Sequence, residues 1–267
     1  MPDAHGHTID ETLLAKVEAI AERAGKVILG FYDGAVATRA KADASPVTAA
    51  DEAAEAVILP ALEPLLPGVP AVSEEAVAAG KIPDVHGPKN PSGRFWLVDP
   101  LDGTKEFISR NGEFTVNIAL IDQGRPILGV VHIPALATTY GGIVPDLARK
   151  RHKGVGRPIA ARNAPADGSI VLSSRSHGDS DAMDAFLAAE RIGGHRIAGS
   201  ALKFCLVAEG IADIYPRLGR TMEWDTAAGH AIIVAAGGRV TRLDGSDLTY
   251  GKPGFDNPHF VARGKVP

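Results

Sequence analysis

The sequence predicts a mixed α/β protein, built as an α+β half followed by an α/β half. Three features predict this class: helical patterns near the N-terminus, a run of strand patterns after them, and alternating strands and helices from about residue 165 onward. No internal repeat, low-complexity tract or long linker separates the halves. We therefore expect two closely packed domains, over residues 1–165 and 166–267.

Two helices are expected near the N-terminus. Thr8 and Glu11 form a capping-box pattern, and apolar residues with helical spacing follow over 13–31. Thr48 and Asp51 form a second helix-start pattern, again followed by apolar residues.

The rest of the N-terminal half is predicted to consist mainly of strands. Apolar patterns place them at 69–73, 95–98, 114–121, 126–133 and 138–144. A loop rich in Gly, Pro and Ala fills 76–94, and the turn Asp122-Gln-Gly-Arg125 joins two strands as a hairpin. The basic stretch RKRHKG at 149–154 is interpreted as a solvated loop, with an anion site as the alternative.

In the C-terminal half the expected elements alternate. Strands are predicted at 170–173, 195–198, 212–215 and 239–243. Helices are predicted between them at 181–192, 201–209 and 226–236. This alternation indicates a sheet with helices on its faces.

Composition and charge narrow the class of ligand. The chain has 267 residues, of which 45% are hydrophobic and 22% charged, as in ordinary globular proteins. Its net charge of −4 argues against a protein that binds nucleic-acid backbones, which normally shows a strong basic excess. A small phosphorylated ligand remains compatible, because a metal ion or a local basic cluster can supply the positive charge.

Cysteine content and hydropathy indicate the compartment. Cys205 is the only cysteine, so an intrachain disulfide is impossible and a reducing compartment is expected. The N-terminus lacks the pattern of a signal peptide, and no apolar stretch has the length of a transmembrane segment. We expect a cytoplasmic protein, with peripheral membrane association left open. The sequence leaves the oligomeric state open as well.

Four carboxylates stand where apolar runs end or helices begin. They are Glu74, Asp99, Asp102 and Asp225. Taken singly, each has an ordinary explanation: Glu74 as a solvated loop residue, DPLDG at 99–103 as a turn, and Asp225 as a helix N-cap. Taken together they point to a cation, because converging like charges would raise each other's pKa values unless a cation lay among them.

The loop after Asp99 is suited to hold such a cation. Pro100 restricts the backbone and Gly103 permits an unusual backbone angle, so both aspartates can be aimed from a rigid loop. Carboxylates with the carbonyl of Leu101 make an all-oxygen set that suits Mg²⁺ or Mn²⁺. The spacing does not fit a calcium-binding EF-hand, which needs a glutamate at its twelfth position and a preceding helix.

The motif VDPLDGTKEF, with SEE at 73–75 and WDTAAG at 224–229, resembles the inositol monophosphatase superfamily of Mg²⁺-dependent, lithium-sensitive phosphatases. The stretches KADASPVTAADEAA, SSRSH and GSALKFCLVAEG resemble its CysQ-type 3′(2′),5′-bisphosphate nucleotidases, and so does Lys-Glu-Phe after DGT. The likeness covers about residues 10 to 250. It implies a layered αβαβα sandwich with the active site between the two halves.

The resemblance also implies an activity. It is hydrolysis of the 3′-phosphate of adenosine 3′,5′-bisphosphate (PAP) to AMP and phosphate, extended to the sulfated relative PAPS, with sulfur metabolism as the setting. The alternatives are an inositol monophosphatase or broad-specificity sugar phosphatase of the same fold and, in another class, a non-catalytic nucleotide or metal sensor. Either enzyme would have a small-molecule substrate and no nucleic-acid partner.

The family pattern implies roles for the carboxylates and their neighbours. Glu74, Asp99 and the Leu101 carbonyl would hold a first Mg²⁺. Asp99, Asp102 and Asp225 would hold a second. Asp51 and Thr104 would polarise the attacking water, with a third metal ion possible near Glu74, and Mn²⁺ is the expected substitute. The capping box with Thr48 competes for Asp51.

The implied substrate contacts lie in two regions. Gly103 and Thr104 would offer backbone N–H groups to the phosphate. His177 would lie against the adenine or ribose, with Ser200, Lys203 and Arg217 near the adenine and the 5′-phosphate. The ordinary alternatives are a helix N-cap for Ser200 and surface charges for Lys203 and Arg217.

Three further residues of reactive type are assigned structural roles. Cys205, between two apolar residues, is expected in the core. His132 and His230 are expected to be structural rather than metal ligands.

Overall fold

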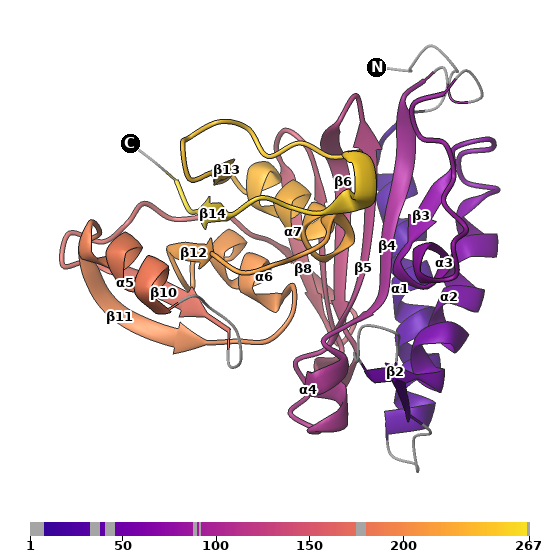
Figure 1. Cartoon of the computed structure of the whole chain (residues 1–267), viewed down its shortest axis with the longest axis horizontal. Helices are drawn as coiled ribbons and strands as arrows, with labels where there is room; N and C mark the ends of the chain where they lie inside the picture. The colour runs from indigo at the N-terminus through magenta and orange to yellow at the C-terminus, as the bar shows by residue number, and fades with distance from the viewer. Residues whose placement is uncertain are drawn as a thin grey trace.

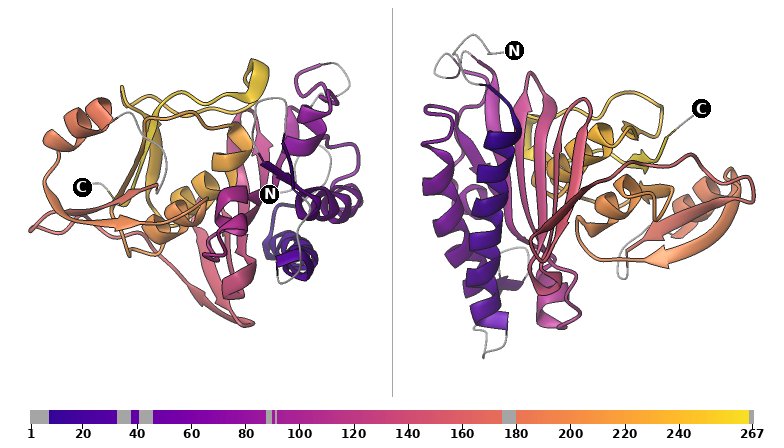
Figure 2. Two further views of the ribbon diagram at one scale, coloured as in Figure 1. Left: turned by 60° about the horizontal axis from the view of Figure 1, so that its bottom comes forward. Right: turned by 180° about the vertical axis from the view of Figure 1, so that it is seen from behind.

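The computed structural model describes residues 8–32, 38–40, 46–87, 90, 92–174 and 180–265. Helices and sheets are stacked in alternating layers (Figures 1 and 2). A pair of long helices covers one face of a seven-stranded sheet, two helices lie between that sheet and a five-stranded sheet, and a last helix lies on the outer side. The predicted layered αβαβα fold is confirmed.

The outer helical layer consists of α1 (Glu11–Tyr32) and α2 (Ala49–Leu62). Their apolar faces pack on each other and on the seven-stranded sheet, as the helical spacing predicted. The start of α1 differs from the capping-box prediction. Asp10, not Thr8, caps the helix, because its Oδ1 accepts the backbone N–H of Leu13 at 2.9 Å.

The larger sheet has the order β3-β4-β5-β6-β7-β8-β9. Its strands are β3 (Ala71–Ser73), β4 (Arg94–Asp102), β5 (Thr115–Asp122), β6 (Arg125–Ile133), β7 (Thr138–Ile143), β8 (Leu147–His152) and β9 (Val155–Pro158). Only β3 and β4 pair in parallel; the other neighbours are antiparallel. The strands predicted over 69–144 are confirmed within a few residues at each end.

The prediction of a solvated loop over the basic stretch at 149–154 is wrong. Most of these residues form strand β8, whose side chains alternate between two buried carboxylates. Arg149 and Arg151 bind Glu18 of α1, and Lys150 on the opposite face binds Glu209. Arg149, Lys150 and Arg151 therefore pair with carboxylates within the fold, and their charges are not left for an anion.

Two helices occupy the layer between the sheets: α6 (Leu202–Ala208) and α7 (Glu223–Ala235). Helix α7 is buried on nearly all sides and lies across the centre of the larger sheet. It approaches β6 closely, since a Cβ on Gly129 would lie only 2.3 Å from the carbonyl oxygen of Ala228. A glycine at this point of the strand lets the helix backbone sit directly on the sheet.

The smaller sheet has the order β11-β10-β12-β14-β13. Its strands are β10 (Ser169–Ser173), β11 (Ile192–Ile197), β12 (Ile214–Arg217), β13 (Arg239–Arg242) and β14 (Phe260–Arg263). Helix α5 (Ser180–Ala188) packs through Phe186 and Leu187 against this sheet. The predicted helix over 181–192 is too long, because Ile192 already belongs to β11, and β14 was not predicted at all.

Short elements complete the described chain. They are β1 (Thr38–Ala40), β2 (Pro46–Thr48), α3 (Glu74–Ala78), α4 (Thr104–Ile108) and the 3₁₀ turns Pro134–Leu136 and Pro253–Phe255. Helix α3 occupies the start of the segment predicted as a loop over 76–94. In the described part of the chain, no helix has the length and apolar character needed to cross a membrane.

The two sheets correspond to different parts of the sequence. The larger sheet ends at Pro158 and the smaller begins at Ser169. Helix α7, although late in the sequence, packs on strands of the larger sheet. The division into domains 1–165 and 166–267 stays a prediction, but the packing of α7 explains how residues from both halves reach one place.

Candidate active site

Strand β4 ends in a bulge that brings Asp99 and Asp102 to one face of the sheet. Residues three apart on a regular strand point to opposite faces. Here Asp99 is opposite Asn117 and Asp102 is opposite Thr115, with a shift of register between the two pairs. Because Thr115 and Asn117 are two apart, the bulge turns both aspartates the same way. Pro100 is tolerated within it, since a bulge leaves a residue without a ladder hydrogen bond.

The predicted turn at 99–103 is therefore displaced. The strand continues through Asp102, and the turn lies at Gly103, whose φ of 91° falls in the left-handed region. A Cβ there would lie 2.0 Å from Oγ of Ser200, so the position also lacks space for a side chain. Thr104 follows as the first residue of α4, so the backbone N–H groups of both residues lie at the start of that helix.

Glu74 and Asp51 reach the same place from neighbouring elements. Glu74 is the first residue of α3, directly after β3, and parallel β3 and β4 end at the same edge of the sheet. Asp51 lies in the first turn of α2 and is only 2% exposed. Thr48, its proposed capping partner, belongs to a segment whose side chains lie outside the described residues.

Asp225 approaches from α7, but not as the N-cap that the sequence suggested. The helix begins at Glu223, so Asp225 is its third residue. Its Oδ2 accepts the backbone N–H of Met222 at 2.9 Å, which is the reciprocal half of a capping box. The other carboxylate oxygen remains available to a further partner.

Burial and mutual repulsion dominate the electrostatics of these groups. Burial raises the pKa of Asp99 well above its ordinary value, and four carboxylates raise it further: Glu74, Asp102, Asp225 and Asp51. Burial, followed by the charge of Asp102, raises the pKa of Asp225 to about 8. These five acidic residues therefore lie close enough for their charges to act on Asp99, while their roles at a metal site stay a prediction.

The pKa of Asp102 is also raised by burial, but positive and polar neighbours oppose the shift. They are Lys203, Asn117 and the backbone N–H of Ala201. The neighbours of Asp102 therefore favour its charged form and partly oppose the effect of burial.

The donor set fits a hard divalent cation. Carboxylate oxygens with a backbone carbonyl at Leu101 are the ligands that Mg²⁺ and Mn²⁺ prefer, and no sulfur or imidazole is among them. Among the residues with described positions, no three Asp, Glu, His or Cys side chains lie so that they could hold a metal ion together as they stand. The set therefore has the right chemistry, while its individual metal contacts stay a prediction.

A turn from the second half of the chain packs against Asp102. Ser200 Oγ donates to the carbonyl oxygen of Asp102 at 2.9 Å, and the Ala201 N–H donates to its Oδ2 at 2.6 Å. Gly199 N–H donates to Glu113 Oε2 at 2.7 Å. The predicted N-cap role of Ser200 is wrong, because α6 begins at Leu202 and Ser200 has a positive φ of 49°.

The side chain of Lys203 is buried, so the alternative prediction of a surface charge is wrong for this residue. Its Nζ donates to the carbonyl oxygens of Ser200 at 2.7 Å and Ala198 at 3.3 Å, and lies 5.2 Å from the ring centre of Tyr215. Burial lowers its pKa to about 8, although Asp102 opposes the shift. The ammonium group therefore holds the turn beside Asp102.

Arg217 lies at the end of β12 near Asp225, whose pKa it lowers. It donates to Ser174 Oγ at 3.1 Å and to the carbonyl oxygen of Arg220 at 3.0 Å.

His177 lies outside the described residues. Cys205 is buried in the core as predicted.

The two other histidines have structural contacts. His132 Nδ1 hydrogen-bonds Thr139 at 2.9 Å, and His230 Nδ1 hydrogen-bonds Tyr250 at 2.9 Å. Both side chains are buried, and these contacts agree with the structural roles predicted for them.

Sequence reasoning missed a group of residues that support the aspartates. Thr115 and Asn117 donate to Asp102, and buried Glu223 accepts backbone N–H groups of Gly251 and Lys252 beside the start of α7. A signal for the first pair was present, since Thr115 and Asn117 are two polar residues on one face of an otherwise apolar strand. No comparable signal marked Glu223.

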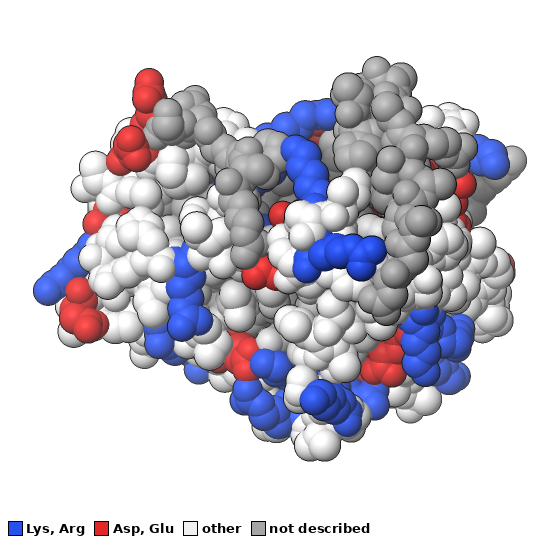
Figure 3. Space-filling view, turned by 90° about the horizontal axis from the view of Figure 1, so that it is seen from below, with Lys and Arg blue, Asp and Glu red and all other residues white. Residues whose placement is uncertain are grey.

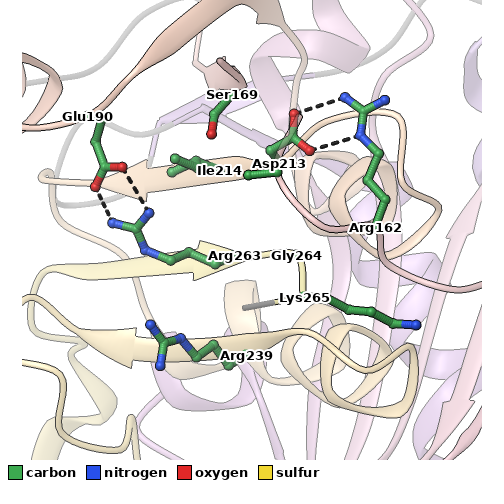
Figure 4. Close-up of a pocket in the computed structure, with 10 residues that line it drawn as sticks. Arg162, Ser169, Glu190, Asp213, Ile214, Arg239, Arg263, Gly264 and Lys265 are labelled. Carbon is green, nitrogen blue, oxygen red and sulfur yellow. Dashed lines mark hydrogen bonds and ion pairs between the residues drawn. The ribbon is translucent and has the colours of Figure 1, made fainter. Parts of the chain in front are cut away.

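A separate pocket of about 240 Å³ lies against the smaller sheet (Figure 4). Asp99, Asp102 and Asp225 are not among the residues that line it. Its two carboxylates are already paired, Asp213 with Arg162 and Glu190 with Arg263. The side chains of Arg239 and Lys265 point in different directions (Figure 4). The pocket lacks convergent groups for a phosphate, so we do not assign the chemistry to it.

The surface seen from the side of α4 carries both signs of charge (Figure 3). Lys and Arg side chains are interspersed with Asp and Glu rather than forming a continuous basic patch (Figure 3). With the net charge of −4, this face gives no support to nucleic-acid binding.

The layered fold and the acidic end of β4 define a class of protein. A model of the inositol monophosphatase family matches residues 9–263, and this chain belongs to that family.

Its curated relatives include proteins named 3′(2′),5′-bisphosphate nucleotidase CysQ. The protein from Salmonella typhimurium is 49% identical over 253 residues, which cover 93% of this chain and 98% of the relative. The one from Escherichia coli strain K12 is 47% identical with the same coverage.

Solved structures agree with this assignment. CysQ from Bacteroides thetaiotaomicron, described as a bacterial member of the inositol monophosphatase family, superposes with a TM-score of 0.80 at 35% identity, covering 97% of this chain and 99% of its own. An IMPase of Thermotoga maritima superposes with a TM-score of 0.74 at 26% identity, covering 95% and 92%. The match to each structure runs through nearly the whole of both chains.

Proposed function

We propose that this protein is a Mg²⁺-dependent phosphomonoesterase that hydrolyses the 3′-phosphate of adenosine 3′,5′-bisphosphate to AMP and phosphate. The observation that carries the proposal is that Asp99, Asp102 and Asp225, from two halves of the chain, are buried near one another: burial raises all three pKa values, and the charge of Asp102 raises those of Asp99 and Asp225 further. The close relatives named as bisphosphate nucleotidases support the choice of substrate. PAPS, the sulfated relative, is a second substrate on the same argument.

Divalent cations would be held by the carboxylates. Glu74, Asp99 and the Leu101 carbonyl would bind one Mg²⁺, and Asp99, Asp102 and Asp225 another. A third would bind near Glu74, and Mn²⁺ would substitute. When bound, such cations neutralise the carboxylates and stabilise the charge that develops during phosphoryl transfer.

The side chains around these ligands would handle the water and the phosphate. Asp51 and Thr104 would orient and polarise the attacking water, and the carboxylate of Asp51 would accept its proton while the water oxygen bonds to phosphorus. The bond from phosphorus to the ribose 3′-oxygen breaks, and that oxygen takes up a proton to give AMP. Backbone N–H groups of Gly103 and Thr104, at the start of α4, would hold the phosphate oxygens.

Residues of the second half would contact the nucleotide. Arg217 is near enough to Asp225 to lower its pKa, and its guanidinium group suits the 5′-phosphate. Ser200 and Lys203 line the turn against Asp102, and their described hydrogen bonds go to the protein backbone. Their contribution to nucleotide binding would therefore be mainly to shape that turn. We retain His177 as the residue that contacts the adenine or ribose.

The test is a comparison of substrates in the presence of Mg²⁺. Phosphate release from adenosine 3′,5′-bisphosphate should exceed release from inositol 1-phosphate and from sugar phosphates. Faster turnover of inositol 1-phosphate would replace the nucleotidase assignment by that of an inositol monophosphatase of the same fold. Nucleotide binding without any phosphate release would favour a sensor.

Lithium gives a second test. Millimolar Li⁺ should inhibit Mg²⁺-activated turnover, as the family resemblance implies, and the inhibition should depend on the Mg²⁺ concentration. An enzyme that is activated by Mg²⁺ and insensitive to Li⁺ would argue against the proposed second metal site.

We place the reaction in the cytoplasm, in keeping with a single buried free thiol.

A further inference from the structure

Two polar side chains of β5 lie on the same face of the sheet as the aspartates of β4. Thr115 is paired in register with Asp102, and Asn117 with Asp99. Their exposed fractions are 0% and 1%. A hydroxyl and an amide so deeply buried are costly unless they are hydrogen-bonded, so their partners indicate why they are there.

Their hydrogen bonds converge on one atom. Thr115 Oγ1 lies 2.9 Å from Oδ1 of Asn117 and 3.3 Å from Oδ2 of Asp102. Asn117 Nδ2 donates to the same Oδ2 at 3.2 Å. The Thr115 hydroxyl has one hydrogen, which it can donate either to Oδ1 of Asn117 or to Oδ2 of Asp102, whereas Asn117 Nδ2 donates to Oδ2 in both arrangements.

A third donor completes the arrangement. The backbone N–H of Ala201, from the turn before α6, reaches Oδ2 of Asp102 at 2.6 Å. Every hydrogen bond that the described residues give this carboxylate therefore ends on Oδ2. Oδ2 therefore lies within hydrogen-bond distance of three donor groups, and Oδ1 accepts none of these hydrogen bonds.

We propose that Thr115 and Asn117 are positioning residues that, with the Ala201 N–H, hold Oδ2 of Asp102 and present Oδ1 to a divalent cation. The inference rests on the proposed function, which requires that cation. A carboxylate fixed by outer hydrogen bonds binds a metal ion without losing rotational freedom, and loss of such partners typically weakens metal binding by about 10–100-fold.

Variants of Thr115 give the sharpest test. Thr115→Val keeps the shape and removes the hydroxyl, whereas Thr115→Ser keeps the hydroxyl. Mn²⁺ binding is measured by electron paramagnetic resonance, and Mg²⁺ binding by calorimetry, without substrate. We expect Thr115→Val to bind Mn²⁺ at least about 10-fold more weakly, and Thr115→Ser to stay within about threefold of the native protein.

Asn117→Ala is compared with a matched control, Thr139→Val. Thr139 is equally buried on β7 of the same sheet and hydrogen-bonds His132, far from the aspartates along the sheet order. Both variants should lower the melting temperature of the metal-free protein by a few degrees, since each loses a buried hydrogen bond. Only Asn117→Ala should lose Mn²⁺ affinity, again by about 10–100-fold.

The outcomes separate this proposal from the proposed function. If Thr115→Val and Asn117→Ala bind Mn²⁺ as tightly as the native protein, the positioning role is overturned while the phosphatase proposal stands. If Thr115→Ser loses as much affinity as Thr115→Val, the hydroxyl is not what matters and the proposal also fails. If the native protein itself binds neither Mn²⁺ nor Mg²⁺, both proposals are wrong.

Discussion

Two groups of buried carboxylates occur in this molecule, and they differ in what lies beside them. In the first group each carboxylate is in ion-pair contact with Lys or Arg: Glu18 with Arg149, Glu209 with Lys150, Asp213 with Arg162, and Glu223 with Lys252. In the second group, Asp99, Asp102 and Asp225, no such ion pair exists within the described residues.

The difference distinguishes carboxylates that stabilise the fold from carboxylates that are suited to bind a cation. A buried charge is tolerated when a partner of opposite charge comes from the fold itself, as in the first group. The second group is assembled from β4 and α7 and is held by backbone N–H groups of Leu101, Ala201 and Met222 instead. Such N–H donors fix the direction of a carboxylate but leave most of its charge for a cation from outside the chain.

The largest expected effect follows from changing the second group. Asp99→Asn should lower turnover of adenosine 3′,5′-bisphosphate by on the order of 10³-fold, because a shared ligand of the catalytic cations is lost. The metal-free protein should not lose stability, since one of several repelling charges is removed. Phosphate release and urea unfolding without metal measure the two effects. A large loss of stability with activity retained would show that Asp99 stabilises the fold, like the carboxylates of the first group, and does not act in catalysis.

Changing the first group should have the opposite signature. Glu18→Gln should destabilise the protein by about 3 kcal/mol, because Arg149 and Arg151 lose a buried partner, while turnover of the folded fraction is unchanged. Glu11→Gln is the matched control: Glu11 is an exposed partner of the same Arg149 and should change stability by less than about 0.5 kcal/mol. Equal effects in both variants would contradict the distinction.

His132 is a buried titratable group outside both groups of carboxylates, and we expect the folded protein to keep it uncharged. Burial lowers its pKa to about 4, so between roughly pH 6.5 and 4 the unfolded chain binds a proton that the folded protein does not. Stability should therefore fall as the pH decreases through this window, by about 2–3 kcal/mol from this group. In His132→Asn this part of the pH dependence should be missing from urea unfolding curves recorded without metal.

The smallest effect is expected at the surface. Arg125 and Asp247 form an ion pair at 2.9 Å with both side chains mostly exposed. Asp247→Asn should change the free energy of unfolding by less than about 0.5 kcal/mol and leave turnover unaltered. A loss comparable to that of Glu18→Gln would show that burial is not what distinguishes these pairs.

The sequence predicted the layered fold and most strands of the larger sheet, since apolar periodicity reports local burial directly. It failed where a distant partner decides the structure. The basic stretch at 149–154 is a strand because Glu18 of α1 receives its arginines, and nothing near 149–154 in the sequence indicates that. Strand β14 was missed for a related reason, because its place between β12 and β13 is fixed by pairing rather than by local pattern.

At the candidate site the sequence located the acidic residues but not their geometry. DPLDG has the composition of a turn, and only the register against β5 reveals that it is a bulge. The start of α7 was placed too late, because Asp225 suits an N-cap and a third helical position equally well. Thr115 and Asn117 were overlooked because their partner Asp102 lies on the neighbouring strand, and local sequence does not give the register that brings them together.

Gly129 has a consequence that reaches beyond packing. The spacing between α7 and β6 is set at this glycine, where even a methyl group would collide with the helix backbone at Ala228. Asp225 lies one helical turn before Ala228 and would be carried outward with it. A larger residue at position 129 would therefore move Asp225 away from the aspartates of β4, although Gly129 has no side chain and takes no part in the chemistry.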